Sequence, residues 1–143
     1  MRFMMLVKAS KESEAGEMPS AELIDAMIKF NEEMAKAGVM QAGEGLHPSS
    51  KGTRIKFEGG KRTVTRGPFA NTAELLAGFW LIDVKSEEEA FQWASKIPFT
   101  DGETVEIRKI FETEEFEGVM SPEAMAREKK LQKELEEKQA KKR

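Results

Sequence analysis

Residues 78–84, with the sequence GFWLIDV, carry the pattern that most restricts how this chain can fold. Four successive apolar residues, Phe79 to Ile82, are typical of a short strand that is buried on both of its faces. Asp83 then interrupts the run, and a carboxylate there needs a partner or a place at the edge of the sheet. We therefore predict a sheet with cover on both sides.

The composition excludes several kinds of site. The 143 residues include no cysteine and one histidine, so disulfides, thiol nucleophiles and cysteine-ligated metals are excluded, and a histidine-rich metal site cannot form within one chain. The 23 basic and 26 acidic residues give a net charge of −3, which argues against nucleic-acid binding. We expect no signal peptide, and no apolar run approaches the roughly 18 residues of a membrane span. We expect a cytoplasmic protein with no cofactor, no metal and neither a membrane nor a nucleic-acid partner.

Helical and strand patterns divide residues 1–112 into two similar halves. Ser20 and Ser86 are suitable N-cap residues for two helices, Gly38 is a suitable C-cap, and Gly59-Gly60 is a hairpin signal. The predicted elements are a strand at 2–7, a helix at 20–37, a strand at 39–46, hairpin strands at 53–57 and 61–65, a strand at 78–84, a helix at 86–96 and a strand at 104–111. This order fits an α+β fold, a ferredoxin-like split βαβ arrangement with an extra central hairpin.

Two helices can cover only one face of such a sheet. The apolar run at 79–82 reaches both faces, so the second face needs different cover. A second copy of the same sheet is the economical candidate. We therefore predict a homodimer in which two sheets pack face to face.

The segment 113–143 differs from the domain before it. An acidic linker leads to Ser121-Pro122, where a hydroxyl N-cap and a proline predict the start of a charged C-terminal helix. Its apolar stripe of Met125, Leu131 and Leu135 is too narrow for a core of its own. The helix is either solvated or lies with this stripe on the domain or on a partner protomer. Interspersed Glu residues argue against a nucleic-acid arm.

An ordered set of motifs over roughly residues 2–112 resembles the YCII-related family, and specifically its DGPF branch. The motifs are Ala42-Gly43-Glu44-Gly45-Leu46, Pro48, Gly67-Pro68-Phe69, Gly78-Phe79, Leu81-Ile82-Asp83-Val84 and Ile97-Pro98. The resemblance implies a ferredoxin-like α+β domain that forms a dimeric α/β barrel. Most members of the family are uncharacterised, a few relatives act as dehydrochlorinases, and some are encoded beside sigma factors.

The sequence also departs from the family pattern. Arg66 stands where the DGPF motif has its aspartate, and Ala73 where a lysine is usual. The His–Asp pair proposed as catalytic in the YCII branch is absent, since the end of the first helix reads Met34-Ala35-Lys36-Ala37. These changes fit either the loss of a site or a site directed at anionic ligands.

His47 and Glu44 are the candidate catalytic residues. An imidazole titrates near neutral pH and suits acid–base work, and a strand carboxylate in a cleft serves the same purpose. The alternatives are a polar loop histidine and an exposed or salt-bridged glutamate. The neighbouring Gly43 and Gly45 predict a bulge or the close approach of another backbone or a ligand.

Arg66, Gly67, Phe69 and Asp83 are the candidate ligand-binding residues. A guanidinium at Arg66 suits a carboxylate or phosphate, or is an ordinary surface group. Gly67-Pro68-Phe69 also has a structural interpretation, in which the turn is stiffened and Phe69 fills the core. The aromatic rings of Trp80 and Trp93, together with those of Phe69 and Phe79, either line a cleft or pack in the core or a dimer interface.

Three functions remain open. The favoured one is a dimer that binds a small polar or anionic molecule near the second strand. The second is a small-molecule enzyme of lyase or hydrolase type with His47 or Glu44 as acid or base. The third is a regulatory protein that interacts with a partner such as a sigma factor.

Overall fold

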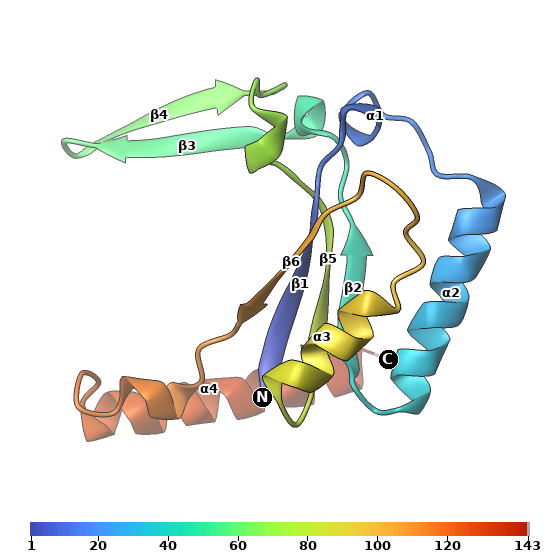
Figure 1. The fold of residues 1–143 in the computed structure, drawn as a ribbon. Helices are drawn as coiled ribbons and strands as arrows, with labels where there is room; N and C mark the ends of the chain where they lie inside the picture. Colours follow the sequence, from blue (N-terminus) through green and yellow to red (C-terminus); the bar gives the residue numbers. More distant parts are fainter. Residues whose placement is uncertain (143) are drawn as a thin grey trace. The chain divides into compact units, whose positions relative to one another are not determined.

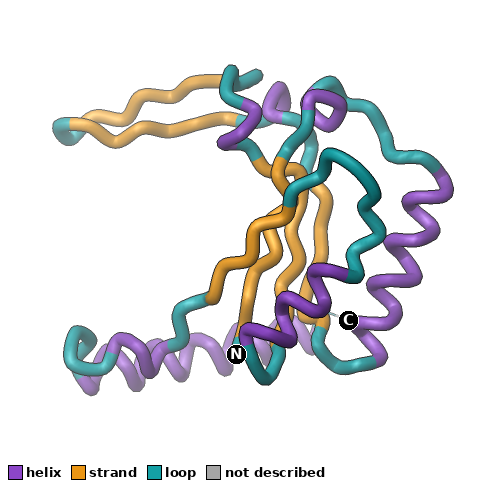
Figure 2. Tube along the Cα trace, viewed as in Figure 1, coloured by secondary structure: helices purple, strands orange, loops and turns teal. Residues whose placement is uncertain are grey.

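The computed structural model describes residues 1–142 (Figures 1 and 2). The chain divides into two compact units, the first spanning Met1–Ile110 and the second beginning at Phe111. The first unit contains β1 (Arg2–Lys8), α1 (Lys11–Glu14), α2 (Ala21–Lys36), β2 (Met40–Gly45), η1 (Ser49–Lys51), β3 (Thr53–Glu58), β4 (Lys61–Arg66), η2 (Thr72–Glu74), β5 (Leu76–Asp83), α3 (Glu87–Ser95) and β6 (Val105–Lys109).

The four main strands form one antiparallel sheet in the order β2-β5-β1-β6, and β3 and β4 form a separate hairpin. Each half of the domain is a strand, a helix and a strand, and Figure 1 shows α2 and α3 on the same side of the sheet. This is the strand order of a ferredoxin-like split βαβ fold. The predicted α+β class with a central hairpin is confirmed.

The side chains of β5 alternate between the two faces of the sheet. Gly78, Trp80 and Ile82 are buried, whereas Phe79 and Leu81 are half-buried on the other face. The register pairs Leu81 with Met4 and Phe79 with Leu6 of β1, so these four apolar side chains share the face that α2 and α3 do not cover. We call this set (Met4, Leu6, Phe79 and Leu81) the open face.

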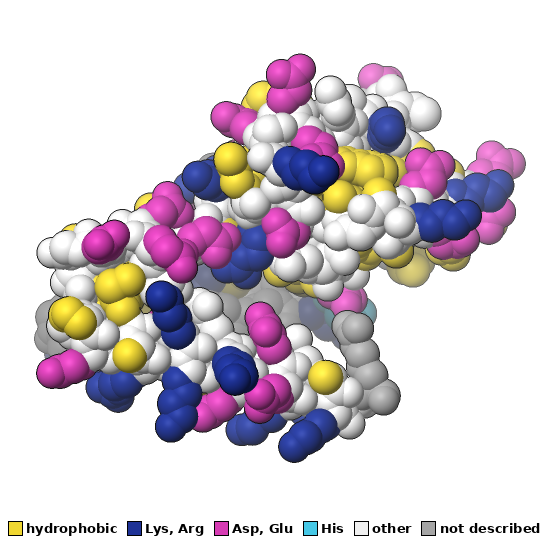
Figure 3. All heavy atoms as spheres, turned by 90° about the horizontal axis from the view of Figure 1, so that it is seen from below, with side chains coloured by type: hydrophobic (Ala, Val, Ile, Leu, Met, Phe, Trp, Pro, Cys, Tyr) yellow, Lys and Arg dark blue, Asp and Glu magenta, His cyan; other side chains and the backbone are white. Residues whose placement is uncertain are grey.

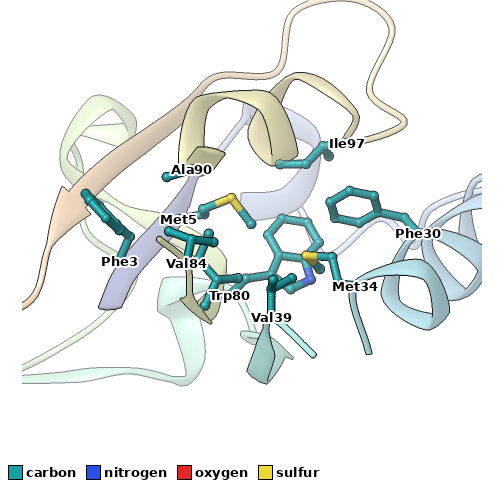
Figure 4. Packing of buried hydrophobic residues seen from close by; sticks show 10 residues of the cluster. Phe3, Met5, Phe30, Met34, Val39, Trp80, Val84, Ala90 and Ile97 are labelled. Carbon is teal, nitrogen blue, oxygen red and sulfur yellow. The ribbon is translucent and has the colours of Figure 1, made fainter. Parts of the chain in front are cut away.

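Trp80 lies at the centre of the buried core (Figure 4). Its ring meets Phe30 of α2 edge to face, with the ring centroids 5.6 Å apart, and its indole N–H donates to Asn31 Oδ1 at 2.9 Å. The other buried side chains of the cluster are Phe3, Met5, Met34, Val39, Ile82, Val84, Ala90 and Ile97. Trp80 and the half-buried Trp93 are therefore core residues, as one of the two interpretations of the sequence expected.

The side chain of Trp80 explains why position 43 is a glycine. A methyl group at this position would lie 2.7 Å from Trp80 Cδ1 and 2.8 Å from Met40 Cε. The predicted close approach is therefore that of a side chain from the same domain. The register of β2 shifts earlier in the strand, between Met40 and Ala42, so the predicted bulge at Gly43 and Gly45 is wrong.

Local signals set most element boundaries. The Ser20 hydroxyl accepts from Leu23 N–H at 3.1 Å and starts α2, and Gly59 and Gly60 adopt positive φ values of 57° and 79° in the hairpin turn. The helix α1 was not predicted, because a reciprocal Ser10–Ser13 capping box holds only four residues, too few to show a helical period.

The second unit contains η3 (Thr113–Phe116) and α4 (Pro122–Lys141). The Ser121 hydroxyl accepts from Ala124 N–H at 3.1 Å, and Pro122 occupies the first turn. Gln132 donates to Thr113 Oγ1 at 3.0 Å, which joins α4 to η3. Basic and acidic side chains are interspersed on the surface seen in Figure 3. No helix within residues 1–142 is both long and apolar enough to cross a membrane.

Candidate functional site

The loop at Gly67-Pro68-Phe69 is bound to two other segments at the base of the hairpin. Gly67 N–H donates to Gly52 O at 3.0 Å, and Phe69 N–H donates to Ser49 Oγ at 3.0 Å. Ser49 in turn donates to the Glu14 carboxylate through its backbone N–H at 2.9 Å and through its hydroxyl. We call these five residues (Glu14, Ser49, Gly52, Gly67 and Phe69) the hairpin root.

The backbone at the hairpin root is close-packed. A methyl group at Gly67 would overlap the carbonyl oxygen of Ser49 and lie 2.7 Å from its carbonyl carbon. The Gly67–Pro68 peptide bond is cis. The Arg54 guanidinium lies 3.9 Å from the centroid of the Phe69 ring, within cation–π range. Phe69 is half-buried under this arginine and is outside the core cluster, so its predicted core-filling role was wrong.

Strand β2 carries Glu44 and leads to His47. Glu44 pairs with Phe79 of the neighbouring strand β5, and its side chain is exposed on the open face. Leu46 N–H donates to Ala77 O at 2.8 Å, so pairing continues one residue beyond β2 and ends just before His47. His47 is exposed and precedes Ser49 of the hairpin root by two residues.

Arg66 is the last residue of β4 and directly precedes Gly67 of the hairpin root. It pairs with Thr53 across the hairpin, and its side chain is exposed. The structure thus places Glu44, His47, Arg66, Gly67 and Phe69 toward one end of the sheet, where β2 ends and the hairpin begins (Figure 1).

Asp83 lies at the other end of β5. It is five residues beyond Gly78, a span of roughly 16 Å along an extended strand. Its partner is the N-terminal ammonium of Met1 at 3.2 Å, which also donates to Val84 O at 2.8 Å. The structure therefore does not bring Asp83 together with the other candidate residues. Although Asp83 ends an interior strand of the sheet, its carboxylate has the Met1 ammonium as a partner.

Two further features of the described residues bear on the site. Residues 1–142 contain no group of three or more His, Cys, Asp or Glu side chains that could hold a metal ion. A shallow hollow of about 240 Å³ lies at the tip of the hairpin, lined by Phe57, Arg62 and the residues between them. This hollow is at the far end of the hairpin from the root.

Sequence reasoning missed Glu14 and Ser49, which hold the root together. The two residues are 35 positions apart, and neither belongs to a motif that links them. The available signal was the Ser10–Ser13 capping box, which fixes the short helix that presents Glu14.

The strand order and these motif-bearing loops define a ferredoxin-like α+β domain. The profile of the YCII-related domain matches residues 1–114, and the chain belongs to this family. It is 41% identical over 49 residues to an uncharacterised protein from Rhizobium meliloti (strain 1021), a match that spans 34% of this chain and 40% of that protein. It is also similar to the structure of a 5-chloro-2-hydroxyhydroquinone dehydrochlorinase from Burkholderia phenoliruptrix in complex with 2,5-dihydroxybenzoquinone. That likeness has 14% sequence identity and a TM-score of 0.40, and it covers 80% of this chain and 98% of the other.

Proposed function

We propose that the protein is a homodimer that binds a small polar or anionic molecule at the end of the sheet where β2 meets the hairpin root. The observation that carries the proposal is the juxtaposition there of exposed ionisable side chains with the apolar open face. Glu44 is directly paired with Phe79 of that face, and the exposed His47 and Arg66 flank the adjoining loops.

The apolar character of the open face supports the proposed dimer. Its four side chains come from the two central strands and form contiguous cross-strand pairs, Met4 with Leu81 and Leu6 with Phe79. An apolar patch on central strands is stabilised when a second apolar surface removes it from water. Two such sheets pack about 10 Å apart, which is the arrangement of a dimeric barrel.

Replacing Leu81 with lysine is expected to convert the dimer to a monomer. A lysine at the centre of the sheet-to-sheet contact would be buried without a partner, which raises the dissociation constant by roughly a hundredfold or more. Sedimentation velocity measures the change, with wild type expected at twice the chain mass of 16.1 kDa. Ile28→Lys, at a half-exposed position of α2 on the other side of the sheet, is the matched control and should leave the mass unchanged. A wild-type protein that sediments as a monomer at micromolar concentration would contradict the dimer.

The binding site combines groups of opposite charge. The Arg66 guanidinium suits a carboxylate or phosphate. The Glu44 carboxylate accepts hydrogen bonds from hydroxyl or amine groups, and the His47 imidazole both accepts and donates them. The same imidazole and carboxylate are also the groups that acid–base catalysis needs. An enzyme acting on such a molecule through His47 or Glu44 is therefore the second candidate function.

Small anions are expected to raise the melting temperature of the protein through Arg66. Succinate, benzoate and inorganic phosphate at millimolar concentration are the probes, because they vary charge and apolar area separately. Arg66→Ala should abolish the stabilisation, whereas Lys85→Ala, at the opposite end of β5, should retain it. Thermal-shift titrations measure both variants at constant ionic strength. Equal stabilisation of wild type and Arg66→Ala would contradict a site at this arginine.

A further inference from the structure

The β3–β4 hairpin carries an apolar face that the domain leaves exposed. All the residues of both strands are exposed, and we call the hairpin, residues 53–66, the arm. Ile55 pairs directly with Val64, and Phe57 lies two residues farther along the same face. Their exposed fractions are 53%, 60% and 68%. Large exposed apolar side chains gathered on one face of a hairpin indicate a surface that binds a second apolar surface.

The arm also lacks the support that a hairpin normally needs. A two-stranded ribbon alone is only marginally stable in water, and stability usually comes from a third strand or from packing on an apolar face. Inside the arm, the apolar face has the Ile55–Val64 pair and the Arg62 guanidinium at 5.0 Å from the centroid of the Phe57 ring. The hairpin root fixes the base of the arm but leaves its length uncovered.

The arm extends in the direction in which a second copy of the chain would lie. Figure 1 shows the arm extending from the top of the sheet on the side away from α2 and α3, which is the side of the open face. Six residues in each strand give the arm a length of about 20 Å. A second sheet seated on the open face would lie only about 10 Å away, so the arm reaches past that sheet along the second copy.

The charges of the arm and the rest of the domain are opposite. The arm has five basic residues and one acidic residue, a net charge of +4. The remainder of residues 1–110 has ten basic and sixteen acidic residues, a net charge of −6. The opposite net charges favour association of the arm of one copy with the domain of a second copy.

We propose that the arm docks on a second copy of this chain, with Ile55, Phe57 and Val64 packed against it and the Arg62 guanidinium, which lies on the same face of the arm, beside them at the contact. This inference rests on the dimer proposed above and adds a second contact to it. In a two-fold dimer the contact occurs twice, because each copy both extends an arm and receives one.

Photo-crosslinking from the arm tests the contact directly. The chain has no cysteine, so Phe57→Cys introduces a single thiol that can carry a benzophenone maleimide. Irradiation is expected to give a species of twice the chain mass on a denaturing gel, with the crosslinked peptide from residues 1–110 of the other copy. Thr63→Cys, on the opposite face of the same arm, is the matched control and should give little of this species. Equal yields from the two positions, or crosslinks confined to one chain, would overturn the proposal.

The dimer dissociation constant separates this proposal from the one it rests on. The double variant Ile55→Ser and Phe57→Ser is expected to raise the constant at least tenfold, whereas Thr63→Ser with Thr65→Ser should leave it unchanged. Because every substituted side chain is exposed in the domain, the circular dichroism spectrum should stay that of wild type. An unchanged constant in the double variant, with the Leu81→Lys protein monomeric, would reject the arm contact and keep the sheet-to-sheet dimer. A monomeric wild type would reject both.

Discussion

Replacement of Trp80 by alanine is expected to lower the free energy of unfolding by about 3–5 kcal/mol. Trp80 is 5% exposed, and it packs against Phe30 at the centre of the core. Truncation removes this contact area and leaves a cavity that α2 and the sheet close only in part. Urea unfolding at a fixed protein concentration, followed by circular dichroism, measures the loss.

Trp80→Phe is the matched variant for the same position. It keeps an aromatic ring against Phe30 and removes the indole N–H that donates to Asn31 at 2.9 Å. The expected loss is smaller, about 1–3 kcal/mol, the usual effect of leaving a partly buried acceptor without its donor. Equal losses for the phenylalanine and alanine variants would contradict a core role based on packing volume.

Replacement of Gly67 by alanine is expected to destabilise the domain by about 1–3 kcal/mol or more, the range for inserting a methyl group where no space exists. The added carbon would overlap the Ser49 carbonyl, which is backbone and cannot move away as a flexible side chain does. Displacing that segment also disturbs the hydrogen bonds from Phe69 N–H to Ser49 and from Ser49 to Glu14. Proteolysis within the arm should therefore accelerate as well.

Gly45→Ala is the control for this substitution. A methyl group at Gly45 would meet no atom within 4 Å, although the residue lies at the end of β2 near the same end of the sheet. Urea unfolding should place it within about 0.5 kcal/mol of wild type, as is usual for surface positions. If Gly67→Ala were as stable as Gly45→Ala, the close packing of the hairpin root would be refuted.

Most of the fold was predictable because its signals are local. Serine caps mark both main helices, Gly59-Gly60 fixes the hairpin turn, and the apolar run at 79–82 identifies a central strand. The same run also predicted that two helices alone cover only one of the strand's two faces. Phe79 and Leu81 are half-buried, because α2 and α3 cover only the opposite face.

The candidate site was predictable only in part, because it depends on contacts between distant segments. Motif residues identified the Gly67-Pro68-Phe69 loop, but the ring of Phe69 lies under Arg54 and outside the core. No pattern in the sequence relates Glu14 to Ser49, since their contact depends on where α1 sits above the end of β2. Asp83 was grouped with these residues as part of a motif, yet strand length alone separates it from them.

The packing of Trp80 over Gly43 makes the residue types at these two positions depend on each other. The indole is the main obstacle to a side chain at position 43, with Cδ1 2.7 Å from where the added carbon would lie, because the other close atom, Met40 Cε at 2.8 Å, ends a flexible side chain. Among relatives, a smaller residue at the Trp80 position would release position 43 from glycine, and the two should change together. The glycine at position 43 would then be required by the neighbouring ring, and its presence in a relative would not indicate a bound ligand.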